Sequence, residues 1–295
     1  MSPPGVEQIA NAVLYEGYIL YPYRASSVKN RRRFNFGVLA PPSYSAAQYG
    51  TEASAMRTEC LITGTRKARL AVRVRFLQVM PGSWQEAMER DIQLAECSLD
   101  DLLSAARHDP FQYDSISGVI AVSAAQVQEG VYRVAVEVSN DTPIEAAASL
   151  TRDEALPYSL AAAHTILTVA DGEFVSLLDP PDELRVAVGA CHNQGTWPVL
   201  AGAPDQRRCM LSSPIILYDY PRIAPESPGD LFDGTEIDEI LTLRIMTLTE
   251  EEKQEIRNGD ARGRRMLERT ELLPEEHLQK LHGALRGLRP AEESR

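Results

Sequence analysis

The stretch SSPIILYDYPRIAPESPGDLFDGTEIDEILTLRIMTLT, Ser212–Thr249, contains the features around which the rest of the chain is organised. Residues 214–220 form a short apolar run bounded by prolines, which predicts a buried strand. The prolines between 221 and 228 then exclude regular structure and stiffen an acidic loop. Thr235 is a good N-cap, and apolar residues follow it at helical spacing. The stretch is therefore predicted to end in an amphipathic helix.

Outside this stretch, most of the chain up to residue 200 has the alternation typical of antiparallel strands. A first strand is predicted over 13–23, and arginines are expected to face outward from a strand over 68–80. Predicted hairpins join 53–63 to 68–80 across Gly64-Thr65, join 117–124 to 131–139 through Gly130, and turn at Asp171-Gly172. The sequence thus predicts an α+β fold of mainly antiparallel hairpins, with one strong amphipathic helix and a short-helical C-terminal tail.

The charge-rich composition after residue 248 predicts a change of domain. We expect an α+β globular domain over 1–248, a helical C-terminal appendage over 249–288, and disorder over 289–295. A further division of the first domain into two β-rich halves near 145–157 stays open. Thr249 with Glu252 predicts a capping box where the appendage begins.

The net charge of −12 is unevenly distributed. Residues 1–80 carry eleven Lys/Arg against four Asp/Glu, whereas residues 81–249 carry nine against 27. Such asymmetry either attracts a charged partner or is neutralised within one fold, and the second interpretation is favoured because the pattern names no partner. Four scattered cysteines without a CxxC pair argue against a zinc ribbon and fit a reducing compartment. With neither a signal peptide nor a bilayer-length apolar run predicted, we expect a cytoplasmic protein.

Two segments are candidate partner-binding surfaces. The first is basic and contains Arg24, Lys29, Arg31, Arg32 and Arg33; the second is the acidic proline loop, with Glu226, Asp230, Leu231, Phe232 and Asp233. The two apolar loop residues suit either an anchor for a partner's groove or a plug for the protein's own core. Nucleic acid is not expected as a partner, because the overall charge is negative and no recognition motif is present.

No cofactor is expected from any signature, although weaker patterns leave metal binding open. A transition metal would be held by His164, Cys191, His192 and Cys209. Their spacing matches no zinc pattern, so small buried cysteines and a polar loop histidine are the favoured interpretation. The carboxylates between Asp219 and Glu236 would suit a hard cation, or else helix caps and arginine pairs. A cysteine nucleophile beside His164 or His192 lacks a supporting glycine-rich loop.

The segments ANAVLYEGYILYPYRASSVKNRRRFNFGVLAP, 10–41, and MLSSPIILYDYPRIAPESPGDLFDGTEIDEILTLRIMTLTEEEK, 210–253, carry a family resemblance. They resemble an uncharacterised bacterial family that accompanies nickel–iron uptake hydrogenase gene clusters. The resemblance transfers no catalytic residue. It implies a cytoplasmic, non-enzymatic accessory role in the assembly, maturation or scaffolding of a hydrogenase, with hydrogenase subunits or maturation proteins as partners.

Overall fold

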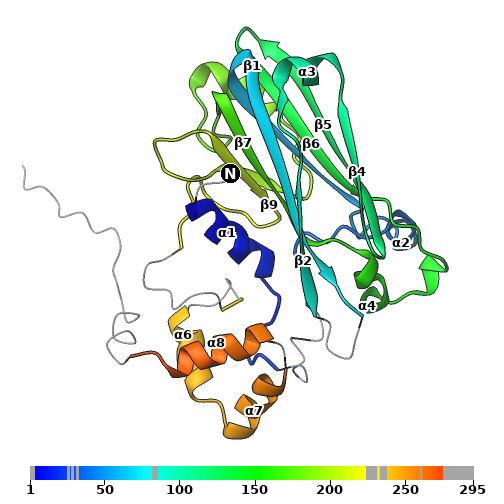
Figure 1. The fold of residues 1–295 in the computed structure, drawn as a ribbon, viewed down its shortest axis with the longest axis vertical. Coiled ribbons are helices and arrows are strands. Elements are labelled where there is room, and N and C mark those ends of the chain that lie inside the picture. The colour runs from blue at the N-terminus through cyan, green and yellow to red at the C-terminus, as the bar shows by residue number, and fades with distance from the viewer. Residues whose placement is uncertain are drawn as a thin grey trace, which may run out of the picture. The chain divides into compact units, whose positions relative to one another are not determined.

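A computed structural model of the chain describes residues 4–24, 27, 30, 33–81, 86–223, 231–232, 238–259 and 261–274 (Figure 1). The pattern of contacts between residues divides the chain into two compact units. The larger comprises Met1–Tyr18 and Arg32–Arg222, and the smaller comprises Ile19–Arg31 and Ile223–Arg295. Within the described part of the chain, no helix is both long enough and apolar enough to cross a membrane.

The larger unit is built on one antiparallel sheet, as the predicted α+β class requires. The sheet contains β1 (Ala55–Val79), β2 (Ala87–Gln93), β3 (Cys97–Ser98), β4 (Arg107–Tyr113), β5 (Ile116–Gln128), β6 (Val131–Asn140), β7 (Ala161–Phe174), β8 (Trp197–Leu200) and β9 (Cys209–Ser213). The strand order is β4-β5-β6-β1-β7-β9-β8, and β2 and β3 also pair with β1. Short helices accompany the sheet: α1 (Pro4–Tyr15), α2 (Pro42–Ala47), α3 (Leu99–Ser104), α4 (Arg152–Ala155) and α5 (Arg185–Gly189). Turns of 3₁₀ helix lie at Ala147–Ser149, Leu156–Tyr158 and Asp182–Leu184.

The long strand β1 organises this sheet. Its first half pairs with β6, its second half pairs with β2 and β3, and β7 pairs along both halves. These strands contribute to a common apolar core, which includes Ile62, Leu70, Phe76, Ile120 and Val134. The edges of β4 and β2 meet through side chains, because Arg90 pairs with Asp114 at 3.1 Å and lies over the ring of Tyr113.

Two of the three predicted hairpins are wrong, and both errors have the same cause. Residues 55–79 form one strand, and so do residues 161–174. The β1–β7 register shifts between Gly64 and Arg69, opposite Asp171, whose φ is 59°. A Cβ on Gly64 would lie 3.1 Å from the carbonyl oxygen of Asp171, so the two backbones approach closely there. Turn-forming residues thus make an irregularity inside two long strands. The hairpin of β5 and β6 through Gly130 is confirmed.

The predicted strand over 13–23 is also wrong, because residues 4–15 form α1. Apolar residues recur at helical spacing from Val6, ahead of the segment that suggested a strand. They bury one face of α1 against β7, β9 and the following segment; the cluster contains Val6, Ile9, Ala10, Val13, Ile166, Ala201, Cys209 and Leu211. The helix is therefore held on the sheet by its apolar face.

The strand predicted over 214–220 is wrong, because none of these residues is in a strand and the strand of this region lies just before them. Strand β9 spans Cys209–Ser213 between β7 and β8, and the ladder stops where Pro214 has no N–H to donate. The segment beyond it stays ordered. Ser213 donates to the Ile215 carbonyl oxygen at 2.7 Å, and the Tyr220 N–H donates to the Leu200 carbonyl oxygen at 2.7 Å.

The smaller unit contains α6 (Asp238–Met246), α7 (Glu250–Asn258) and α8 (Ala261–Glu271). The predicted capping box is confirmed, with Thr249 and Glu252 at the start of α7. The strongly amphipathic character predicted for α6 is not confirmed, because Leu241 and Ile245 are buried while Leu243 and Met246 are each 41% exposed. The predicted N-cap Thr235 lies outside the described residues.

Candidate functional site

The residues predicted to bind a partner are placed only in part. Lys29, Arg31, Arg32, Glu226, Asp230 and Asp233 lie outside the described residues. Arg24 pairs with Glu252 at 3.1 Å and with Glu255 at 3.8 Å, inside the smaller unit. Arg33 is buried, with its guanidinium over the rings of Tyr18 and Phe34. Leu231 and Phe232 are 3% and 7% exposed, as a core plug would be. Their burial leaves these last three side chains little surface for a partner.

The four residues predicted to hold a transition metal lie in different surroundings. His164 is buried on β7 and Cys209 on β9, whereas Cys191 packs beside Leu61 and Val131. The backbone N–H of His192 donates to the buried Glu59 carboxylate at 2.9 Å. Within the described residues, no group of three or more His, Cys, Asp and Glu side chains is arranged to hold a metal ion.

The thiols are poor nucleophiles. Burial raises the pKa of Cys209 to about 12 and that of Cys191 to about 11, and it raises the pKa of Cys60 further. Only the thiolate attacks an electrophile, so these cysteines are held in their unreactive form. The Asp219 carboxylate does not assist a cysteine nucleophile. It accepts hydrogen bonds from Ser176 at 2.5 Å and from the Leu200 N–H at 2.8 Å.

This environment predicts slow thiol labelling. In the folded protein at pH 8, Cys60 and Cys209 are expected to react with an aromatic disulfide reagent at least about a hundredfold more slowly than free cysteine, because both are buried and protonated. Labelling at each site is measured by mass spectrometry, and the urea-unfolded chain is the control. Equal rates in the folded and unfolded chain would contradict the assignment.

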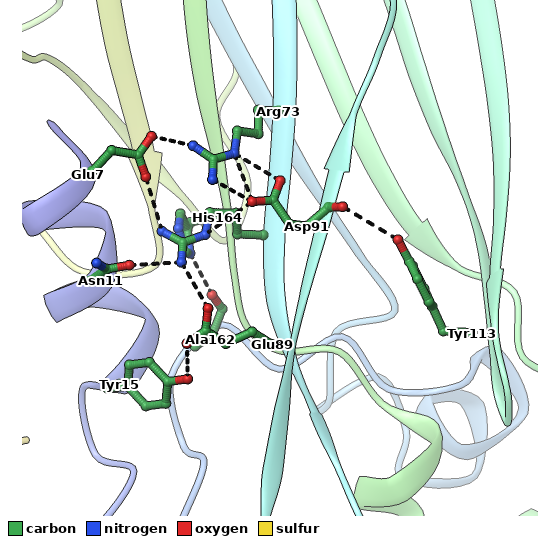
Figure 2. Close-up of polar contacts among 10 residues, drawn as sticks. Glu7, Asn11, Tyr15, Arg73, Glu89, Asp91, Tyr113, Ala162 and His164 are labelled. Atoms are coloured by element: carbon green, nitrogen blue, oxygen red, sulfur yellow. Dashed lines mark hydrogen bonds and ion pairs between the residues drawn. The ribbon is translucent and has the colours of Figure 1, made fainter. Parts of the chain in front are cut away.

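A charged cluster lies on the sheet face that α1 covers. Cross-strand pairing places Asp91 of β2 opposite Arg75 of β1, and Arg75 opposite His164 of β7. Because side chains alternate along a strand, Arg73 and Glu89 share this face with them. Figure 2 shows Glu7, Asn11 and Tyr15 of α1 pointing toward the same cluster. Residues from four separate parts of the chain therefore meet here.

Arg73 lies between two carboxylates. It forms ion pairs with Glu7 and Asp91, and its Nε is 2.8 Å and 3.0 Å from the two oxygens of Asp91. Burial alone would raise the pKa of Asp91, but the hydrogen bonds and charge of Arg73 outweigh it and lower that pKa. The hydrogen bond from Arg73 to Asp91 likewise raises the pKa of Arg73. The guanidinium thus joins helix α1 to strand β2.

Arg75 is the more deeply buried of the two arginines, with a side chain only 5% exposed. Its Nη2 donates to Asn11 at 2.8 Å and to Glu89 at 3.4 Å, and Glu89 also accepts from the hydroxyl of Tyr15. Its Nη1 has no hydrogen-bond partner within the described structure and forms only a looser ion pair with Glu7 Oε2, 3.8 Å away. The cost of burying the charge of such an arginine is offset only while carboxylates surround it.

His164 lies beneath this cluster and is fully buried. Its Nδ1 is 2.9 Å from the Ala162 carbonyl oxygen, so Nδ1 carries the proton and Nε2 is left as an acceptor. Burial lowers the pKa of His164 to about 4, despite the bond to Ala162, and the charges of Arg75 and Arg73 add to the effect. The ring is therefore neutral at pH 7. A neutral imidazole with so low a pKa is a weak base, so its position supports packing more than proton transfer.

A pocket of about 500 Å³ opens beside the cluster. It is lined by Glu7, Ala71, Val72, Arg73, Asp91, Gln93, Ile166 and Thr168. The site was not predicted from the sequence, because the arginines of β1 were expected to face solvent. The available signal was the matching alternation of Glu89 and Asp91 along 87–93, a strand of opposite charge.

Comparison with known proteins adds no functional assignment to this geometry: the chain matches no protein-family model and no curated protein.

Proposed function

We propose that this chain is a non-enzymatic accessory protein that acts in the cytoplasm in the assembly, maturation or scaffolding of a nickel–iron uptake hydrogenase. Its partners are hydrogenase subunits or maturation proteins. The choice of partner rests on the resemblance of segments 10–41 and 210–253. The choice of a binding role rests on one observation, the exposure of Ile216 and Tyr218 within the second of these segments.

Ile216 and Tyr218 are 72% and 85% exposed. Their neighbours Ile215 and Leu217 pack against the cluster beneath α1, so alternate side chains face inward and outward. The segment is also held at its end, where Asp219 and Tyr220 hydrogen-bond to Leu200. Large apolar side chains on a fixed backbone lose little conformational entropy when a partner covers them, which suits a binding hot spot.

A capture experiment tests this proposal. The tagged full chain is used to purify binding partners from cells that express a nickel–iron hydrogenase and from cells that lack it. The wild-type chain is expected to enrich a hydrogenase subunit or maturation protein, and the Ile216→Ser/Tyr218→Ser variant is expected to lose at least about tenfold of that capture.

The matched control is Tyr49→Ser/Val186→Ser, which removes an aromatic and an aliphatic side chain that are 97% and 88% exposed elsewhere on the larger unit. This control should retain capture, and all three chains should unfold at the same temperature. Absence of every hydrogenase component from the wild-type capture would refute the proposed partner. Equal capture by the Ile216→Ser/Tyr218→Ser variant would refute the proposed surface.

A further inference from the structure

The pocket beside α1 has the size and the mixed lining of a small-molecule site. Its volume of about 500 Å³ lies within the range of about 300–1,000 Å³ that such sites occupy. Register places Ala71 opposite Thr168 and Arg73 opposite Ile166, so apolar and polar side chains alternate on its floor, with Ala71 and Ile166 diagonal to each other. Glu7 lines it from the helix, and Asp91 and Gln93 line it from β2.

The charge around the pocket favours a cation. Glu7 and Asp91 line it beside Arg73, and both also pair loosely with Arg75 behind it, at 3.8 Å and 3.9 Å. Arg75 in turn pairs with Glu89 at 3.4 Å, so three carboxylates surround two guanidiniums and leave one net negative charge. Both carboxylates retain contact with solvent, with side chains 34% and 42% exposed. Glu7 Oε1 accepts from Arg73, whereas Oε2 accepts no hydrogen bond from any described residue. A carboxylate has about four acceptor positions, so both groups can bind a further donor.

An anionic ligand fits this lining poorly. The guanidinium of Arg73 already donates from Nε, Nη1 and Nη2 to Glu7 and Asp91. A ligand carboxylate would therefore compete with two protein carboxylates for one guanidinium, and it would be repelled by both. An ammonium group avoids this competition, because it adds donors where acceptor positions remain.

We propose that this pocket binds a small organic ammonium compound, with its ammonium group at Glu7 and Asp91 and a short apolar stem against Ala71 and Ile166. Gln93 of β2 and Thr168 of β7 provide polar contacts on either side of β1. The site is separate from the surface formed by Ile216 and Tyr218, and its occupancy does not depend on the proposed function.

The test compares three probes with the same stem. Butylammonium, butanol and butyrate are titrated into the full chain, and the methyl NMR signals of Ala71, Ile166 and Thr168 are followed. Butylammonium is expected to shift these signals to saturation at millimolar concentration, with butanol weaker and butyrate giving no saturable shift. Saturation by butyrate at the same concentration as butylammonium, or at a lower one, would overturn the proposal, as would the absence of any saturable shift with butylammonium.

Two variants separate the effect of the carboxylate charge on butylammonium binding from the effect of the pocket's shape. Glu7→Gln removes one carboxylate and should weaken butylammonium binding at least about fivefold, the loss of one partly screened ion pair. Since that change could also loosen α1, a second variant keeps every charge: Ala71→Leu fills the floor of the pocket and should abolish the shifts. The control Glu183→Gln lies on an exposed turn and should bind like wild type. Wild-type affinity in Ala71→Leu would place the ligand elsewhere and overturn the proposal.

Discussion

Replacing Gly118 with alanine is expected to destabilise the larger unit by about 3 kcal/mol, the upper end of the cost of overpacking a core. Gly118 lies on β5, where a Cβ would come within 2.2 Å of the Ser139 carbonyl oxygen and 2.5 Å of Phe111 Cζ. The oxygen belongs to the neighbouring strand β6, so it cannot move without breaking the β5–β6 ladder. Phe111 in turn packs against the buried Phe76, with ring centroids 5.9 Å apart.

Urea unfolding of wild type, Gly118→Ala and Gly189→Ala measures this effect. Gly189 ends α5, and a Cβ added there would have no heavy atom within 4 Å, so alanine should be neutral or stabilising by up to about 1 kcal/mol. The thermal midpoint of Gly118→Ala should fall by roughly 10 °C. An unchanged urea midpoint for Gly118→Ala would show that the close contact between β5 and β6 does not exist.

The second large effect concerns pH. His164 has a folded pKa of about 4, against an ordinary value of 6.5, so the unfolded chain binds its proton more readily than the folded protein. The stabilisation that His164 contributes by being buried in its neutral form is therefore complete above pH 6.5. It falls as the pH drops from 6.5 to 4 and changes no further below pH 4. Its total is about 3 kcal/mol, and its steepest slope is about 1.4 kcal/mol per pH unit.

Two carboxylates lose stabilisation at the acid end of this range and below it, and their effect must be separated from that of His164. Asp91 and Glu59 have lowered pKa values, so they also lose stabilisation as they are protonated in acid. Unfolding free energies of wild type and His164→Gln are therefore measured between pH 4 and 7. The variant is expected to be less stable at pH 7, because a packed ring is lost. Its unfolding free energy should nevertheless change less between pH 4 and 7, because the proton that His164 binds on unfolding is no longer taken up.

His108→Gln is the matched control, since His108 is exposed on β4. It should keep the wild-type pH dependence. If His164→Gln and wild type had parallel stability curves across this range, the histidine would have to be protonated as easily in the folded protein as in the unfolded chain.

The sequence predicted the fold class because alternation is a local signal, and it predicted the β5–β6 hairpin because Gly130 joins two adjacent strands. It failed at Gly64 and Asp171, where the same residue types serve a turn or an irregularity within a strand. Which of the two forms depends on pairing between β1 and β7, which lie about 100 residues apart in sequence. Local pattern cannot distinguish these outcomes.

The charged cluster was hidden for a related reason. Arg73 and Arg75 alternate with apolar residues, a pattern that also describes a solvated strand face. Their burial follows from Glu7, Glu89 and Asp91, which approach from α1 and β2 only after the chain has folded. The signature of the pocket is thus tertiary, whereas the signature of the strands is local.

The shared strand β1 also has a consequence for synthesis of the protein on the ribosome. β1 ends at Val79, but β7, which pairs with both of its halves, is complete only at Phe174. At ordinary translation rates this interval lasts on the order of ten seconds. During that time one edge of β1 in the nascent chain remains unpaired, because β7 has not yet been synthesised. Chaperones that shield unpaired strands should therefore matter most for this protein before its second half has emerged.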